Sequence, residues 1–184
     1  MTMRLRSFGR TNLVLLLFAA TTLGRVERAS AQEAPAADPA DVASVDAILG
    51  AVYDVISGPA GAPRDWDRMR SLFVAEARLI PSFVNAEDEI GYRFMSVSEW
   101  IEGAESYFAE NAFYEVEIHR VDERYGHIAH AFSTYESRRE AEGEPFTRGI
   151  NSFQLLFDGS RWWIVNIYWQ GETDSEPIPE RYLP

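Results

Sequence analysis

The chain has 184 residues, of which 46% are hydrophobic and 13% aromatic, a composition typical of a packed globular protein. It contains no cysteine and no lysine, which excludes thiol nucleophiles, disulfides, thiolate metal sites and lysine Schiff bases. The formal net charge is −12. Because so acidic a surface repels phosphate backbones and anionic lipid headgroups, we expect neither nucleic-acid nor membrane-surface binding.

Residues 1–31 have the pattern of an export signal. Three arginines in the first ten residues precede an apolar run, Leu13–Leu23, and Ala29-Ser30-Ala31 forms a small-residue cleavage pattern. The apolar run is shorter than the ~20 residues that cross a bilayer. We expect cleavage near Ala31 and a periplasmic or secreted protein without membrane attachment, whereas the alternative is a frayed N-terminal helix. The mature charge would be 12 − 28 = −16.

Three helices are expected after a linker at residues 32–40. Asp41 is the predicted cap of the first, in which apolar residues recur at helical spacing up to Ile56. The Gly- and Pro-rich segment 58–63 ends it, and Asp65 caps a short second helix. Ser96 or Ser98 caps a third helix that contains Trp100.

Strands are predicted at residues 77–84 and 89–95 and, where the apolar period changes to two, at about 113–123, 127–138, 146–157 and 161–170. Short turns join the last four strands into an antiparallel meander. Three helices packed on a curved, mainly antiparallel sheet of about six strands give one α+β domain over residues 41–172, followed by a tail at 173–184.

The last two strands are apolar on both faces. A tight turn near Gly159 would place Trp162, Ile164, Asn166 and Tyr168 beside Asn151, Phe153, Leu155 and Phe157. The opposite face would carry Trp163, Val165, Ile167 and Trp169 with Arg148, Ile150, Ser152, Gln154 and Leu156. One layer of helices covers one face, so we expect a homodimer through the other, unless the C-terminal tail folds over it.

The order of these elements resembles the NTF2-like superfamily (SnoaL-like, a cystatin-like cone), and the resemblance implies a curved sheet that is mixed but mainly antiparallel. The resemblance is carried by Arg64–Trp66, Leu72–Phe73, Ala77–Leu79 and Gly159–Val165, and the stretches 129–138, 148–156 and 177–184 are similar to a bacterial exported subgroup of unassigned function. The superfamily includes isomerases, dehydratases, epoxide hydrolases, polyketide cyclases and proteins without activity, so the resemblance implies a fold and not a reaction.

Ketosteroid-isomerase-like members of the superfamily carry a general-base aspartate on their first strand, just before a proline. The matching stretch here is Ala77-Arg78-Leu79-Ile80-Pro81, which has no carboxylate. Because a general base must lie within ~3 Å of the proton that it removes, we do not expect that activity.

Histidines offer one candidate cluster. His127 and His130 point to opposite faces of a strand and cannot chelate together. A turn at Arg124-Tyr125 would place His119 opposite His130, where the pair could hold a metal or relay a proton; a three-residue loop that includes Gly126 would break the pairing. Separate, structural histidines are the preferred interpretation, and no metal site is predicted.

A small-molecule site is expected where polar-tipped side chains converge within apolar stretches. The candidates are Tyr53, His130, Tyr135, Asn151, Asn166 and Tyr168. Arg148 could bind a ligand carboxylate, or pair with Glu136 or Glu144. Phosphate loops, EF-hand loops and catalytic-serine motifs are absent from the sequence, and no cofactor is expected.

Two functions remain open. The first is a domain that binds a small apolar ligand or a protein partner in its cone. The alternative is a SnoaL-like enzyme, a lyase, isomerase or hydrolase, that uses His130, Tyr53 or Tyr135 as acid–base groups. The enzyme requires a titratable group inside the pocket, whereas the binding protein does not.

Overall fold

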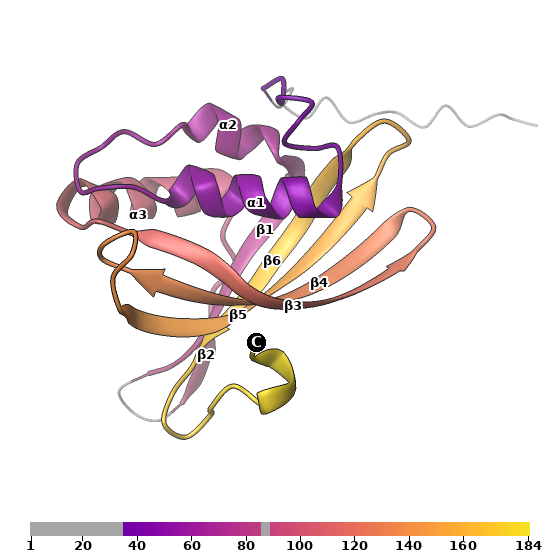
Figure 1. The fold of residues 1–184 in the computed structure, drawn as a ribbon. Coiled ribbons are helices and arrows are strands. Elements are labelled where there is room, and N and C mark those ends of the chain that lie inside the picture. Colours follow the sequence, from indigo (N-terminus) through magenta and orange to yellow (C-terminus); the bar gives the residue numbers. More distant parts are fainter. Residues whose placement is uncertain (1–34, 86–88) are drawn as a thin grey trace, which may run out of the picture.

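A computed structural model describes residues 35–85 and 89–184, so the predicted export signal lies outside the described residues. The elements are α1 (Val45–Ile56), α2 (Trp66–Ser71), β1 (Phe73–Val84), β2 (Ile90–Tyr92), α3 (Val97–Glu110), β3 (Tyr114–Tyr125), β4 (Ile128–Arg138), β5 (Pro145–Phe157), β6 (Trp162–Gly171) and the 3-10 turn η1 (Glu180–Tyr182). The three helices lie on one face of a curved, six-stranded sheet (Figure 1), which confirms the predicted α+β class.

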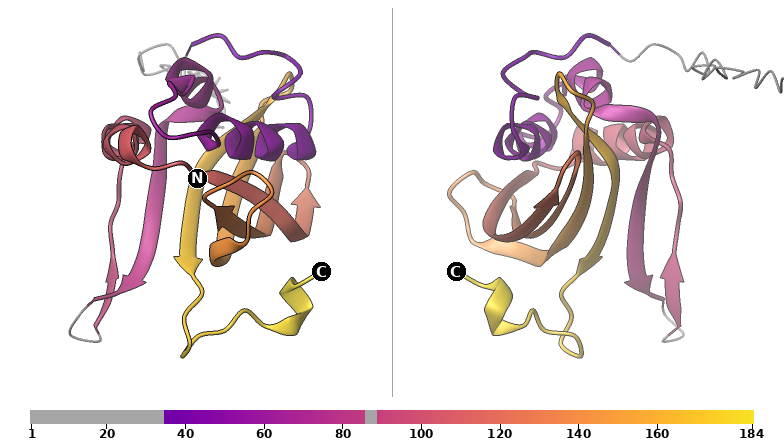
Figure 2. Two further views of the ribbon diagram at one scale, coloured as in Figure 1. Left: turned by 60° about the vertical axis from the view of Figure 1, so that its left-hand side comes forward. Right: turned by 90° about the vertical axis from the view of Figure 1, so that its right-hand side faces the viewer.

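The strands follow the order β2-β1-β6-β5-β4-β3. β1 and β6 are parallel and every other neighbouring pair is antiparallel. The sheet curls beneath the helices (Figure 2), and the core fills the space between its concave face and the helices. None of the helices in the described residues has the length and hydropathy needed to cross a membrane.

Helix α1 begins three residues later than Asp41 would have set it. Ser44 is the cap, because its hydroxyl accepts a hydrogen bond of 3.0 Å from the Ala47 amide. Asp41 instead binds Arg68 of α2 at 2.7 Å, and this hydrogen bond lowers the pKa of Asp41. The expected cap is therefore an ion pair that ties the segment before α1 to α2.

The caps of the other two helices match the prediction. The Asp65 carboxylate accepts from the Arg68 amide at 2.9 Å. Ser96, rather than Ser98, caps α3, and the Glu99 carboxylate accepts in return from the Ser96 amide at 2.8 Å, which completes a capping box.

The turn between β3 and β4 differs from the prediction. Tyr125 pairs with Ile128, so the turn is made by Gly126 and His127, with Gly126 at φ +55°. A bulge after Glu117 shifts the register once more. His130 consequently lies opposite Glu123 and His119 opposite Thr134, so the alternative in which the two histidines pair is not realised.

A bulge in β6 reverses the faces expected for its second half. Leu155 pairs with Ile164, but the next partners are Gln154 and Asn166, so Val165 is an extra residue. Because successive strand side chains alternate, one extra residue sends all later ones to the opposite face. Ile167 and Trp169 therefore share the concave face with Phe153 and Asn151, and Asn166 and Tyr168 share the outer face with Gln154 and Ser152.

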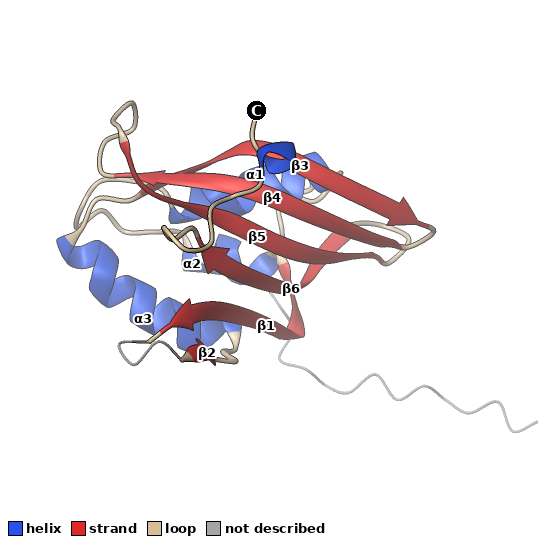
Figure 3. Cartoon of the chain, turned by 90° about the horizontal axis from the view of Figure 1, so that it is seen from below, coloured by secondary structure: helices blue, strands red, loops and turns tan. Residues whose placement is uncertain are grey.

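The C-terminal tail folds back across the outer face of the sheet, which Figure 3 shows from below. Thr134 of β4 donates a hydrogen bond of 2.7 Å to the carbonyl of Tyr182, whose ring lies 4.9 Å from that of Phe132. Ile178 is buried. The tail covers part of this face and leaves Leu156, Val165 and Tyr168 exposed.

Candidate functional site

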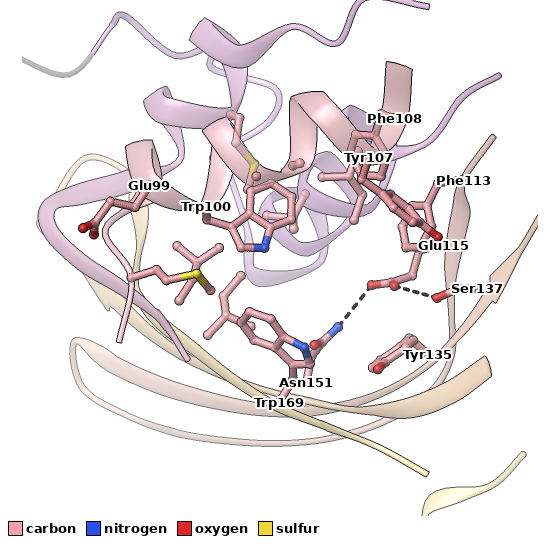
Figure 4. Close-up of a pocket in the computed structure, with 18 of the residues that line it drawn as sticks. Glu99, Trp100, Tyr107, Phe108, Phe113, Glu115, Tyr135, Ser137, Asn151 and Trp169 are labelled. Carbon is pink, nitrogen blue, oxygen red and sulfur yellow. Dashed lines mark hydrogen bonds between the residues drawn. The ribbon is translucent and has the colours of Figure 1, made fainter. Parts of the chain in front are cut away.

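A cavity of about 430 Å³ lies between the helices and the concave face of the sheet (Figure 4). Its wall is largely apolar, and its aromatic members include Trp100, Tyr107, Phe108, Phe113, Tyr135 and Trp169. Glu115, Ser137 and Asn151 supply polar groups, and the exposed side chains of Arg93 and Glu99 border the cavity. A few polar groups in an otherwise apolar hollow are the usual composition of a small-molecule site.

Glu115 is the carboxylic acid of this cavity, and its side chain points inward from the start of β3 (Figure 4). The Ser137 hydroxyl donates to its Oε2 at 2.8 Å, and the Asn151 amide donates to its Oε1 at 3.4 Å. Burial raises the pKa of Glu115 to about 7, against the opposing effect of these two donors. The carboxyl group therefore changes its charge near neutral pH.

The register of the sheet explains these contacts. Phe113 forms an isolated bridge with Gly58 at the end of α1, which fixes the start of β3 beneath the helices. Glu115 is two residues further on and faces the same way, and its partner across β4 is Ser137. Asn151 reaches the same point because β5 pairs with β4 on the other side.

A hydrogen-bonded chain leads from Glu115 to a second carboxylate. Asn151 Nδ2 also donates to the Tyr53 hydroxyl at 3.2 Å, and that hydroxyl lies 2.7 Å from Ser133 Oγ. Ser133 donates its proton to Glu117, so the Tyr53 hydroxyl must be the donor to Ser133. The hydrogen bonds therefore run outward from the Asn151 amide, to Glu115 on one side and through Tyr53 and Ser133 to Glu117 on the other, and this fixes the orientation of the amide.

Tyr53 stays neutral within this chain. Burial, reinforced by the nearby Glu115 carboxylate, raises the pKa of Tyr53 far above its usual value. The pKa of Tyr135 is raised by the same two causes. Neither phenol is therefore a phenolate at physiological pH, and Glu115 carries the charge change.

The structure divides the predicted site residues between two faces. Tyr135 and Asn151 line the cavity, and Tyr53 contacts it through Asn151. Asn166 and Tyr168 lie on the outer face, because the β6 bulge moves them there. His130 also lies outside, where its Nε2 is 3.0 Å from the Ser152 hydroxyl. The predicted set is thus not one site.

The remaining candidates from the sequence are Arg148, a histidine metal site and the stretch 77–81. Arg148 binds Glu172 at 2.8 Å, rather than Glu136 or Glu144. Within residues 35–85 and 89–184, no three His, Asp or Glu side chains gather to hold a metal ion. In the stretch 77–81, which has no carboxylate, Leu79 is the residue that lines the cavity.

Glu115, Ser137 and Ser133 were not predicted as site residues. In Tyr114-Glu115-Val116-Glu117 the alternation suggests that the apolar residues face the core and the acids face solvent. The structure shows the reverse for Glu115. Pairing Glu115 with Ser137 across the β3–β4 hairpin would have indicated this inward face, but the bulge after Glu117 made the register unpredictable.

Comparison with known proteins gives structural neighbours alone, since no family model and no curated protein sequence matches the chain. A protein of unknown function with a cystatin-like fold from Nostoc punctiforme is 8% identical, with 71% of this chain and 90% of that chain covered and a TM-score of 0.55. An uncharacterised protein with a cystatin-like fold from Caulobacter vibrioides is 8% identical, with 72% and 90% covered and a TM-score of 0.50.

An NTF-2-like protein of unknown function from Silicibacter pomeroyi is 17% identical, with 71% of this chain and 94% of that chain covered and a TM-score of 0.49. At such identities the likeness concerns the fold and carries no activity across. The two neighbours with TM-scores of 0.55 and 0.50 show that the chain has a cystatin-like fold, as expected from the order of its elements.

Proposed function

We propose that this protein binds a small, largely apolar molecule in its cavity, with Glu115 as the polar anchor. The observation that carries the proposal is a single inward-facing carboxyl group, held by Ser137 and Asn151, in a cavity with aromatic walls. Removing a carboxyl group from water costs free energy, and the packing of the core does not need a carboxyl at this position. A bound ligand that contacts the group would offset that cost.

Unused hydrogen-bond donors in the cavity support the same function. In the described part of the chain, no protein group accepts from the Tyr135 hydroxyl or from the indole N–H of Trp100 or Trp169. These donors are not sealed in the core, since the buried side-chain atom without a partner in the described residues is Arg138 Nε, so water can reach them and a ligand can take its place. A ligand with one or two acceptor atoms on an apolar body would satisfy them.

The second candidate is acid–base chemistry on the bound molecule. Glu115, with its pKa raised to about 7, is able both to donate and to accept a proton at neutral pH, as a catalyst of proton transfer must. His130 lies on the outer face and the two cavity-side phenols have raised pKa values, so Glu115 takes the acid–base role that the sequence suggested for them.

A neutral fluorescent probe, N-phenyl-naphthylamine, tests binding in the cavity. Its fluorescence should rise on titration with the protein and saturate at one molecule per chain. Ala104 of α3 lines the cavity, so Ala104→Phe should weaken binding at least about tenfold by filling it. Ala109→Phe is the matched control, because Ala109 is exposed on the same helix.

Circular dichroism should show that both variants keep the wild-type fold. Equal binding of the probe by the two folded variants would contradict the proposed site.

Export and self-association are further proposals. Export rests on the basic, apolar and small-residue pattern of residues 1–31, and the mature chain should begin near Gln32. Mass spectrometry of periplasmic and extracellular fractions checks this, and an intact chain from Met1 recovered from the cytosol alone would contradict it.

A homodimer through the outer face rests on the apolar residues that the tail leaves exposed there.

A further inference from the structure

The acidic side chains that are partly buried elsewhere in the fold are paired with arginine. These ion pairs are Asp41–Arg68 at 2.7 Å, Glu117–Arg120 at 3.6 Å, Glu136–Arg138 at 2.9 Å and Glu172–Arg148 at 2.8 Å. Glu115 differs, since within the described residues it forms no ion pair and its hydrogen-bond partners are the neutral Ser137 and Asn151. Its carboxylate therefore lacks a counter-charge of its own.

Aromatic rings surround the space in front of this carboxylate. Five aromatic residues line the cavity with Glu115 and are labelled in Figure 4: Trp100 and Tyr107 of α3, Phe113 just before β3, Tyr135 of β4 and Trp169 of β6. The negative faces of aromatic rings attract cations, with Trp the strongest. A carboxylate within an aromatic enclosure is a chemical environment suited to an ammonium group.

We infer that the ligand of this cavity is a cation, an amine with an apolar body whose ammonium group lies beside Glu115. The inference rests on the proposed function and adds the charge of the ligand to it. An anionic ligand would lie against an unpaired carboxylate, and Arg93 at the border of the cavity is accompanied by Glu99, which offsets its charge. The net charge of −12 also raises the local concentration of cations.

The groups around Glu115 indicate that the pH dependence of amine binding near neutral pH comes from Glu115. Tyr53 of α1 and Tyr135 of β4 have raised pKa values and stay neutral, and Arg93 and Glu99 lie at the border. Glu115 itself has a pKa of about 7. An ammonium group favours its ionised form, so binding below pH 7 must first release the Glu115 proton.

Calorimetric titration with three matched compounds tests the inference: naphthylmethylamine, naphthylmethanol and naphthoate. At pH 8 the amine should bind at least about tenfold more tightly than the alcohol, and naphthoate should bind more weakly than either. Between pH 8 and pH 6 the amine should lose about tenfold in affinity while the alcohol changes little, because Glu115 protonates in this range.

Two charge-neutralising variants identify the group responsible. Glu115→Gln should remove the preference for the amine over the alcohol and abolish the pH dependence of amine binding. Glu123→Gln removes the same charge from an exposed position on the same strand and should behave as wild type. Equal affinity for amine and alcohol in the wild-type protein would overturn the inference and leave the proposed function intact, whereas no binding of either compound would overturn both.

Discussion

The hydroxyl of Ser137 donates a hydrogen bond of 2.8 Å to the carboxyl group of Glu115, its direct cross-strand partner. This pairing places Glu115 inside an apolar cavity, where burial raises its pKa to about 7. An ordinary glutamate in water is fully ionised at that pH. The stability of the fold should therefore depend on the protonation of one residue.

Glu115→Gln tests this dependence. The unfolded chain releases the Glu115 proton near pH 4.5 and the folded chain near pH 7, so the folded state binds more protons between these values. The free energy of unfolding should therefore fall as the pH rises from 4.5 to 7, and this contribution should be constant above pH 7. Urea unfolding at each pH should show that the stability of wild type relative to Glu115→Gln falls across this window. Parallel pH profiles of the two proteins would refute the raised pKa.

Asn151 should couple energetically to Tyr53, because its amide donates to the Tyr53 hydroxyl at 3.2 Å. Asn151→Leu and Tyr53→Phe should each lower the free energy of unfolding by about 1–3 kcal/mol, since each leaves a buried polar partner unsatisfied. The double variant should lose less than the sum, with a coupling of about 0.5–1.5 kcal/mol. Strict additivity in urea unfolding would show that this hydrogen bond contributes no stability.

Gly149 should resist substitution because of its close packing against Tyr135. A Cβ atom at this position would lie 2.5 Å from the Gln170 carbonyl and closer still to the Tyr135 hydroxyl. Gly149→Ala should lower the free energy of unfolding by about 1–3 kcal/mol and displace the Tyr135 ring from the cavity wall.

Gly50→Ala is the control for that substitution, because no atom lies within 4 Å of the added Cβ. It should be neutral or stabilising, since alanine favours the helix by up to about 1 kcal/mol. A Gly149→Ala protein as stable as wild type would mean that Tyr135 and the strands around it can move apart without a loss of stability.

The proposed homodimer should depend on the outer face of β6. Tyr168 is 48% exposed there, so Tyr168→Glu should shift a dimer to monomer in analytical ultracentrifugation at micromolar concentration. Tyr125→Glu changes a more exposed tyrosine, at 84%, at the end of β3 and should leave the mass unchanged. A monomeric wild-type protein would show that the tail, with the polar groups around it, suffices to cover this face.

The helices and the meander could be predicted from the sequence because their signals are local. Apolar residues at helical spacing and a cap suffice for α1 and α3, and alternation between turn residues suffices for the last four strands. The predicted cap of α1, Asp41, was wrong, and the actual cap, Ser44, lies three residues further on, because element boundaries are the least reliable part of a prediction from sequence. The predicted homodimer and export signal remain predictions.

The site depended on register, which the sequence alone does not determine. One extra residue, Val165, moved Trp169 to the cavity side and Tyr168 to the outer face, the reverse of the expected arrangement. Glu115 faces inward because the β3–β4 pairing and the bridge of Phe113 to Gly58 fix its strand under the helices, although its apolar neighbours suggest an outward direction. Strand side chains alternate with a period of two, so a single bulge reverses every later residue, and long-range pairing between strands decides where it falls.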